Sequence, residues 1–199
     1  MSTMGRIASL VMLLLAPAVA SARTHGYTNK EAVKVGDELT TQMQIAPDKR
    51  AIIHDRLQGW MAETRNTKYS GLPISGVFAY HAGEGGVIVK VIRGKGLLRY
   101  YGEDTDHPLL IKSLTAGAQL GGSSEMGVGV VLGPNASKTF GGDYKMTELA
   151  ATAGSASASS AELRRKGGGT GSERVVLVGT STGLQGTAAG GKLQIIVER

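Results

Sequence analysis

The feature that most constrains the fold is a change in residue pattern at Gly71. From this point most of the 30 glycines of the chain separate short runs in which apolar and β-branched residues alternate with polar ones. Glycine weakens helices but suits turns, bulges and positions where two backbones approach closely. Alternation with a period of two is typical of strands with one buried face. The sequence therefore predicts a β-dominated body.

Strands are predicted where these runs are longest. Two runs on either side of Gly94-Lys95 indicate a β-hairpin, and a polar turn is expected over 102–106. The alanine- and serine-rich tract at 150–161 is interpreted as a closely packed strand, with a linker as the alternative, and the segment 162–172 as a flexible loop. The expected strands are 87–92, 97–101, 114–120, 126–132, 146–157, 174–178 and 192–198, and a short helix is expected over 134–140.

Two amphipathic helices are predicted before the β body. In the first, Asn29 is the expected N-cap, and apolar residues recur at steps of three or four. The second begins at Pro47, a favoured residue of the first helical turn. The residues expected to face the core are Ala32, Val35, Leu39 and Met43 in the first helix and Ile52, Ile53, Leu57, Trp60 and Met61 in the second.

The first 22 residues resemble a secretory signal peptide. Arg6 precedes an apolar run over 7–15, and small residues lead up to Ala22, where cleavage is expected. The apolar run is shorter than the ~20 residues that a membrane-spanning helix needs. We therefore expect an exported protein, periplasmic or secreted and in contact with a membrane surface, with one domain over 23–199.

Composition restricts the chemistry. The chain has no cysteine, which excludes disulfides and thiolate sites. Loss of Arg6 with the signal peptide would lower the formal net charge from +6 to +5. This excess favours anionic partners such as phospholipid headgroups, although an ordinary solvated surface explains it equally well.

No catalytic motif is recognisable. The histidines lack the i, i+4 spacing of helical zinc sites, and the glycine-rich segment 186–192 lacks the hydroxyl residue that follows the lysine of a phosphate loop. We expect no metal, no cofactor and no enzymatic activity. A weaker alternative is an enzyme that uses Glu103, Asp104 or His107. Asn135 begins a glycosylation sequon whose use depends on the host pathway.

The segments from Gly76 onward carry a family resemblance. The strand Gly76-Val77-Phe78-Ala79-Tyr80, the glycine-led segment from Gly85 to Leu98 and the Gly-x-Gln-x-Gly pattern at Gly117-Ala118-Gln119-Leu120-Gly121 follow two N-terminal helices in this order. This arrangement resembles the SYLF domain family, which includes lipid-binding and actin-patch proteins of eukaryotes and exported bacterial proteins. The chain departs from it at His81-Ala82, where relatives often have proline, and in the basic segment 162–172.

The resemblance implies an α+β fold, with two N-terminal helices packed on a curved, mainly antiparallel, barrel-like glycine-rich β-sheet. It also implies non-catalytic binding of anionic phospholipid at the cell envelope. We expect no nucleic-acid binding, because basic residues are scattered and aromatic residues are few. The candidate headgroup ligands are Lys30, Lys34, Lys49, Arg50, Lys90, Arg93, Lys95 and Arg99.

The alternative function is structural. A protein-interaction domain of the periplasm or cell surface would dock an envelope protein through an exposed sheet edge or through the basic segment at Arg164-Arg165-Lys166.

Overall fold

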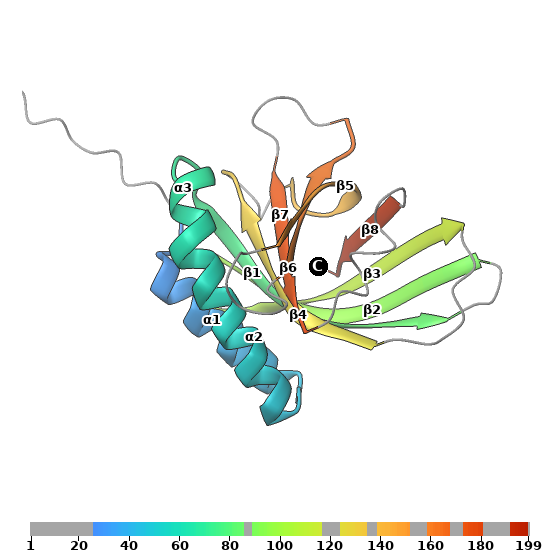
Figure 1. Ribbon diagram of the computed structural model, residues 1–199, viewed down its shortest axis with the longest axis horizontal. Helices are drawn as coiled ribbons and strands as arrows, with labels where there is room; N and C mark the ends of the chain where they lie inside the picture. Colours follow the sequence, from blue (N-terminus) through green and yellow to red (C-terminus); the bar gives the residue numbers. More distant parts are fainter. Residues whose placement is uncertain are drawn as a thin grey trace, which may run out of the picture.

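The computed structural model describes residues 26–85, 89–116, 124–134, 139–151, 159–167, 173–180 and 192–198. Helices come first and strands follow (Figure 1). The helical elements are α1 (Asn29–Gln42), α2 (Pro47–Trp60), a π-helical turn η1 (Met61–Arg65) and α3 (Asn66–Lys68). The strands are β1 (Ile74–Gly85), β2 (Val89–Tyr100), β3 (Asp106–Ala116), β4 (Ser124–Leu132), β5 (Gly142–Ala151), β6 (Ser159–Arg165), β7 (Arg174–Gly179) and β8 (Lys192–Val197).

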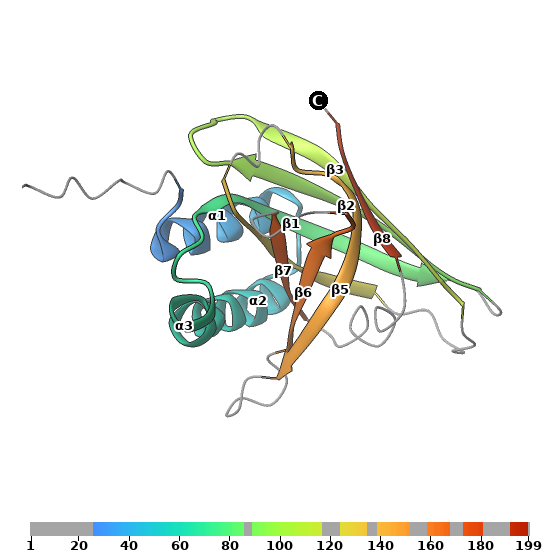
Figure 2. The ribbon, with the colours of Figure 1, turned by 90° about the horizontal axis from the view of Figure 1, so that it is seen from above.

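The strands form a closed antiparallel barrel. Their order around the ring is β1-β2-β3-β8-β5-β6-β7-β4, so β4 returns to β1 and no described strand is left as a sheet edge. The helices lie together on one side of this barrel (Figure 2). The predicted α+β fold with a curved, barrel-like antiparallel sheet is thus confirmed. An exposed sheet edge, one of the two docking modes expected for a protein partner, is not present among the described strands.

Two apolar cores meet at the wall of the barrel. Along β1, Phe78 and Tyr80 point into the barrel, while Val77 and Ala79 point outward to the helices. Successive side chains of a strand point to opposite faces, so a strand buried on both sides is apolar throughout. The outward residues of β4 and β7 that complete the helix-covered core are Val128, Val130, Leu132, Val176 and Val178.

The helices begin and pack much as their sequence predicts. Helix α1 is capped by Thr28 rather than Asn29, because the Thr28 hydroxyl accepts from the Glu31 amide at 3.2 Å and the Glu31 carboxylate accepts from the Thr28 amide at 2.8 Å. Gly36 lies in α1 where a Cβ would stand 3.1 Å from Leu57 of α2. The glycine therefore permits close helix packing. Ile52 was expected in the core but is 37% exposed, because it lies on the outer side of α2.

The hairpin predicted around Gly94-Lys95 is wrong. Strand β2 continues through both residues, and its antiparallel neighbours are β1 and β3. Gly94 is needed for close approach, since a Cβ there would lie 2.9 Å from the Cβ of Ala82. Strand β2 ends at Tyr100. Gly102, with a φ of +80°, lies in the predicted polar turn that leads to β3.

The segment 162–172 was expected to be a flexible loop, but its first part is strand. Residues up to Arg165 belong to β6, and Glu162 is 3% exposed. The described strands also correct other boundaries: β3 starts at Asp106 rather than at 114, and β5 starts at Gly142 rather than at 146. The strands at 126–132, 174–178 and 192–198 are confirmed to within two residues. The signal peptide, the Gly-x-Gln-x-Gly segment, most of the helix expected at 134–140 and the centre of the alanine-rich tract lie outside the described residues.

The packing inside the barrel leaves no room for a side chain at Gly129. Gly129 is the cross-strand partner of Phe78, whose ring occupies the space that a Cβ would need. Gly129→Ala should lower the free energy of unfolding by about 1–3 kcal/mol, because the buried ring has to move. Denaturant unfolding followed by fluorescence of Trp60 measures this change.

The matched control is Gly59→Ala. Gly59 lies in α2, and a Cβ there meets nothing within 4 Å. Alanine should raise the stability there by about 0.5–1 kcal/mol through helix propensity. Equal effects of the two substitutions would contradict the packing described for Phe78.

Candidate functional site

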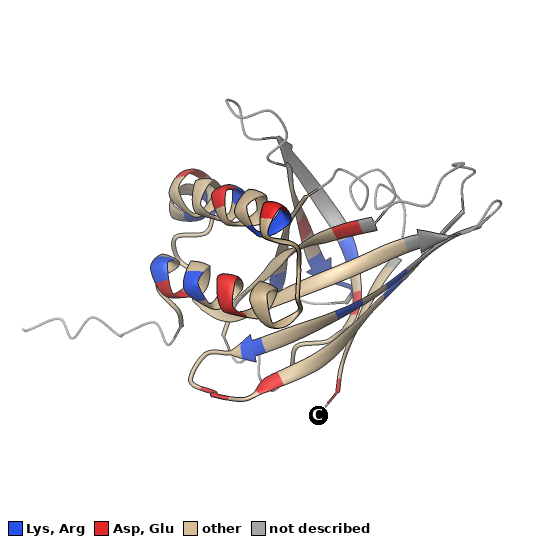
Figure 3. Cartoon of the chain, turned by 90° about the horizontal axis from the view of Figure 1, so that it is seen from below, with Lys and Arg blue, Asp and Glu red and all other residues tan. Residues whose placement is uncertain are grey.

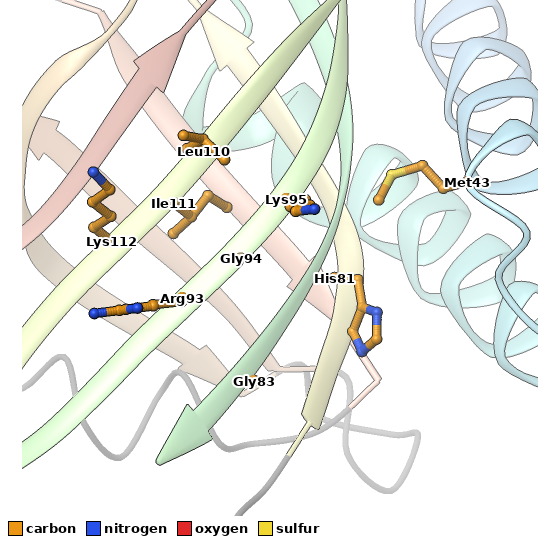
Figure 4. A pocket seen from close by; sticks show the side chains of 9 residues that line it. All are labelled: Met43, His81, Gly83, Arg93, Gly94, Lys95, Leu110, Ile111 and Lys112. Carbon is orange, nitrogen blue, oxygen red and sulfur yellow. The ribbon is translucent and has the colours of Figure 1, made fainter. Parts of the chain in front are cut away.

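The described residues form one open groove with a distinctly basic lining. It has a volume of about 540 Å³ and lies on the outside of the barrel, across β1, β2 and β3 (Figure 4). We call it the β1–β3 groove. Its lining residues are Met43, His81, Gly83, Arg93, Gly94, Lys95, Leu110, Ile111 and Lys112.

The strand register explains why the basic side chains meet. His81 on β1 is paired with Lys95 on β2, and Gly83 is paired with Arg93. Arg93 is in turn paired with Lys112 on β3. Because paired residues share a face of the sheet, these side chains lie together on the outer surface. Figure 4 shows Arg93 and Lys112 extending side by side from adjacent strands.

The groove carries positive charge that the described part of the protein does not neutralise. Arg93, Lys95 and Lys112 are all exposed, and in that part none has a hydrogen-bond or ion-pair partner. Like charges directly opposite each other on neighbouring strands are destabilising. An anion bound between Arg93 and Lys112 would relieve this repulsion and accept charge-assisted hydrogen bonds.

The groove also has an apolar side. Leu110 is the cross-strand partner of Lys95, and Met43, from the connection between α1 and α2, faces the groove from the helical layer. Gly83 and Gly94 contribute only backbone, so part of the groove carries no side chains. Cations beside an apolar surface match a ligand that combines an anionic group with hydrocarbon.

The structure separates the candidate residues of the sequence analysis. Arg93 and Lys95 lie in the groove, whereas Lys30, Lys34, Lys49 and Arg50 belong to α1 and α2. Figure 3 shows how Lys and Arg are spread over helices and strands. Two of the helical lysines lie near carboxylates, with Nζ–Oε1 of 3.8 Å for Lys34 and Glu38 and Nζ–Oδ2 of 3.4 Å for Lys49 and Asp48.

Arg99 is already engaged within the protein. Its Nε and Nη2 donate to Asp106 at 2.7 and 3.0 Å, and its Nη1 donates to Glu38 of α1 at 2.6 Å. These bonds connect the helical layer to the β2–β3 turn, so we leave Arg99 out of the proposed site. Lys90 lies in β2 opposite Thr115, and its side chain is outside the described residues.

Sequence reasoning missed Lys112, Leu110 and Met43 as groove residues and assigned His81 only to a departure from the family pattern. Lys112 is 17 positions or more from Arg93 and Lys95 in sequence, so no local spacing joins them. The available signal was the alternation within 106–116, which places Leu110 and Lys112 on one face. Using it would have required knowing that β3 pairs with β2.

Other polar side chains outside the groove are bonded to each other within the protein. The Nε2 atom of His107 lies 2.9 Å from Oε2 of Glu103, and these are two of the three residues named for an enzymatic alternative. Inside the barrel the Tyr80 hydroxyl donates to Glu125 at 2.7 Å, and burial together with this carboxylate raises the pKa of Tyr80 well above its ordinary value. Among the described residues no three His, Asp or Glu side chains are grouped as metal ligands.

A buried carboxylate on β6 joins this strand to the end of the helical layer. Glu162 accepts hydrogen bonds from the Tyr69 hydroxyl at 2.6 Å and from Arg164 Nε at 2.9 Å, and Lys68 Nζ lies 3.0 Å away. Burial alone would raise the pKa of Glu162, but the hydrogen bonds from these three side chains outweigh it and hold the pKa at about 2.

Comparison with known proteins identifies no family for this chain. No protein-family model matches the chain, and no curated protein matches it in sequence. The chain is similar to a solved structure described as a beta-barrel-like, uncharacterized protein from Brucella abortus, with 18% sequence identity and a TM-score of 0.49. The likeness covers 87% of this chain and 96% of that protein. Within the described residues, no helix combines the length and the hydrophobicity required to cross a bilayer.

The role of Glu162 predicts a specific pH dependence. Its pKa is lower in the folded state than the ordinary value of 4.5, so its stabilising effect is complete above about 4.5 and is lost as the pH falls through about 2. Glu162→Gln should therefore lower the free energy of unfolding by about 1–3 kcal/mol at pH 7. Urea unfolding over this pH range should show the two proteins converging in acid. A constant difference down to pH 2 would contradict this assignment.

Proposed function

We propose that the chain is an exported, SYLF-like, non-catalytic module that binds anionic phospholipid, with the headgroup in the β1–β3 groove. The observation that carries the proposal is the row of Arg93, Lys95 and Lys112 beside Leu110 and Met43, which no described acidic side chain neutralises. The sequence resemblance and the signal-like N-terminus support it, and they make the periplasm or the extracellular surface the place of binding.

The residues of the groove have distinct roles in this proposal. The planar guanidinium of Arg93 donates two hydrogen bonds to one phosphate, while Lys95 and Lys112 contribute compact positive charges. His81, paired with Lys95, lines the β1 side of the groove. Leu110 and Met43 contact the glycerol and the upper acyl chain. No bond is made or broken, and the affinity comes from charge and from burial of apolar surface.

The proposal predicts salt-sensitive binding to anionic vesicles. The full protein should float with phosphatidylcholine vesicles that contain phosphatidylglycerol and should not float with phosphatidylcholine alone. High salt should weaken the binding because exposed charges are screened. Replacing both members of the cross-strand pair, R93Q/K112Q, should lower the affinity roughly 30-fold, since each basic residue near an anionic surface contributes about 1 kcal/mol.

The matched control is K30Q/K34Q, which removes the same charge from α1. Lys30 and Lys34 are exposed, and the groove does not include them. This variant should retain most of the binding. If both variants lose binding equally, the groove is not the site and only net charge matters. If the protein never floats but retains one stoichiometric envelope protein, the protein-interaction function is correct instead.

A further inference from the structure

A second basic surface lies on a different part of the barrel. Strands β5, β6 and β7 place Lys145, Arg164 and Arg174 in one cross-strand row, because Lys145 is paired with Arg164 and Arg164 with Arg174. Lys68 of α3 is added to this row because its Nζ lies 3.0 Å from Oε2 of Glu162 on β6. We call these four residues the β5–β7 face.

The β5–β7 face retains positive charge despite its carboxylate. Glu162 is the one acidic side chain that contacts it among the described side chains, and it lies within 4 Å of Lys68, Arg164 and Arg174. Among the described side chains, three cations surround this carboxylate and Lys145 adds a fourth positive charge, so the face has an excess of three positive charges. Lys145 is exposed and has no partner in the described structure. Arg164 has a side chain that is 49% exposed, so its remaining donors are open to solvent.

Two acidic positions lie next to this row. Asp143 lies two residues before Lys145 on β5 and accepts from Gln194 at 3.3 Å. Glu148 is the register partner of Glu162, and its side chain is outside the described residues. The row itself contains only basic residues. Its charge complements an anionic surface of the same kind as the one proposed for the β1–β3 groove.

The two basic surfaces lie on opposite sides of the ring. Three strands separate β2 from β6 in either direction around the ring. They are β1, β4 and β7 in one direction and β3, β8 and β5 in the other. Strand β2 carries Arg93 and Lys95, and β6 carries Arg164. Figure 2 shows the β2–β3 side and the β5–β6 side of the barrel facing different directions. One flat bilayer therefore cannot contact both surfaces at once.

We infer that the protein bridges two anionic phospholipid bilayers, one at the β1–β3 groove and the other at the β5–β7 face. The inference rests on the proposed function for the groove and adds a second, independent membrane contact. The face lacks an apolar groove among its described residues, so this contact is electrostatic and weaker. A monomer with two opposed contacts gathers vesicles together, whereas a monomer with one contact only coats them.

Mixing donor-labelled and acceptor-labelled vesicles tests the inference. Both populations contain phosphatidylcholine with phosphatidylglycerol, and energy transfer between them reports clustering, while flotation of the same samples reports binding. Wild-type protein should produce both signals. The variant K145E/R164Q should still float but should lose clustering. K145E alone should show a large partial loss, and because Lys145 has no partner among the described residues it should fold normally.

A control variant and the oligomeric state distinguish bridging by a monomer from other causes of clustering. The charge-matched control K30E/K34Q, which lowers the net charge by the same three units as K145E/R164Q, should cluster vesicles as the wild type does, and sedimentation should show a monomer. If K145E/R164Q clusters vesicles as well as the wild type, or if clustering requires a dimer, the bridging inference is overturned while the groove proposal stands. If K145E/R164Q floats normally and wild type never clusters, an acidic protein is the better partner for this face and the inference fails. Loss of flotation by the wild type instead overturns the proposed function itself.

Discussion

The burial of β1 on both faces is the constraint on which the rest of the structure depends. Phe78 and Tyr80 fill the barrel, while Val77 and Ala79 form the floor on which the helices pack. The ring closes through the pairing of β1 with β4, and that closure depends on Phe78 lying over Gly129. Since the same strand begins the wall of the β1–β3 groove at His81, the two cores hold the site in place.

Local physical chemistry accounts for what the sequence predicted well. The helices were predictable because Pro47, Leu39 and Leu57 act through spacing and capping within one element. The β-dominated body was predictable from glycine and alternating apolar residues, whereas the barrel-like α+β architecture was implied by the family resemblance. Strands β7 and β8 were recognised because their runs of valine, leucine and isoleucine follow glycine-rich segments.

The errors concern residues whose partners are distant in sequence. Gly94 was interpreted as a turn because its close approach to Ala82 depends on the register of β1 and β2. Glu162 was placed in a loop because the residue that donates to it, Tyr69, is 93 positions away. For the candidate site, Arg93 and Lys95 were named from charge, but Lys112 joins them only through the pairing of β2 with β3.

The position of β8 has a consequence for how the chain reaches its folded state. This strand is the last in sequence, yet it lies between β3 and β5 and completes the ring. A growing chain therefore leaves β3 and β5 without this neighbour until β8 has been made. Closure of the barrel waits for this strand, and the incomplete ring, with its unpaired strand edges, is the state most prone to aggregation.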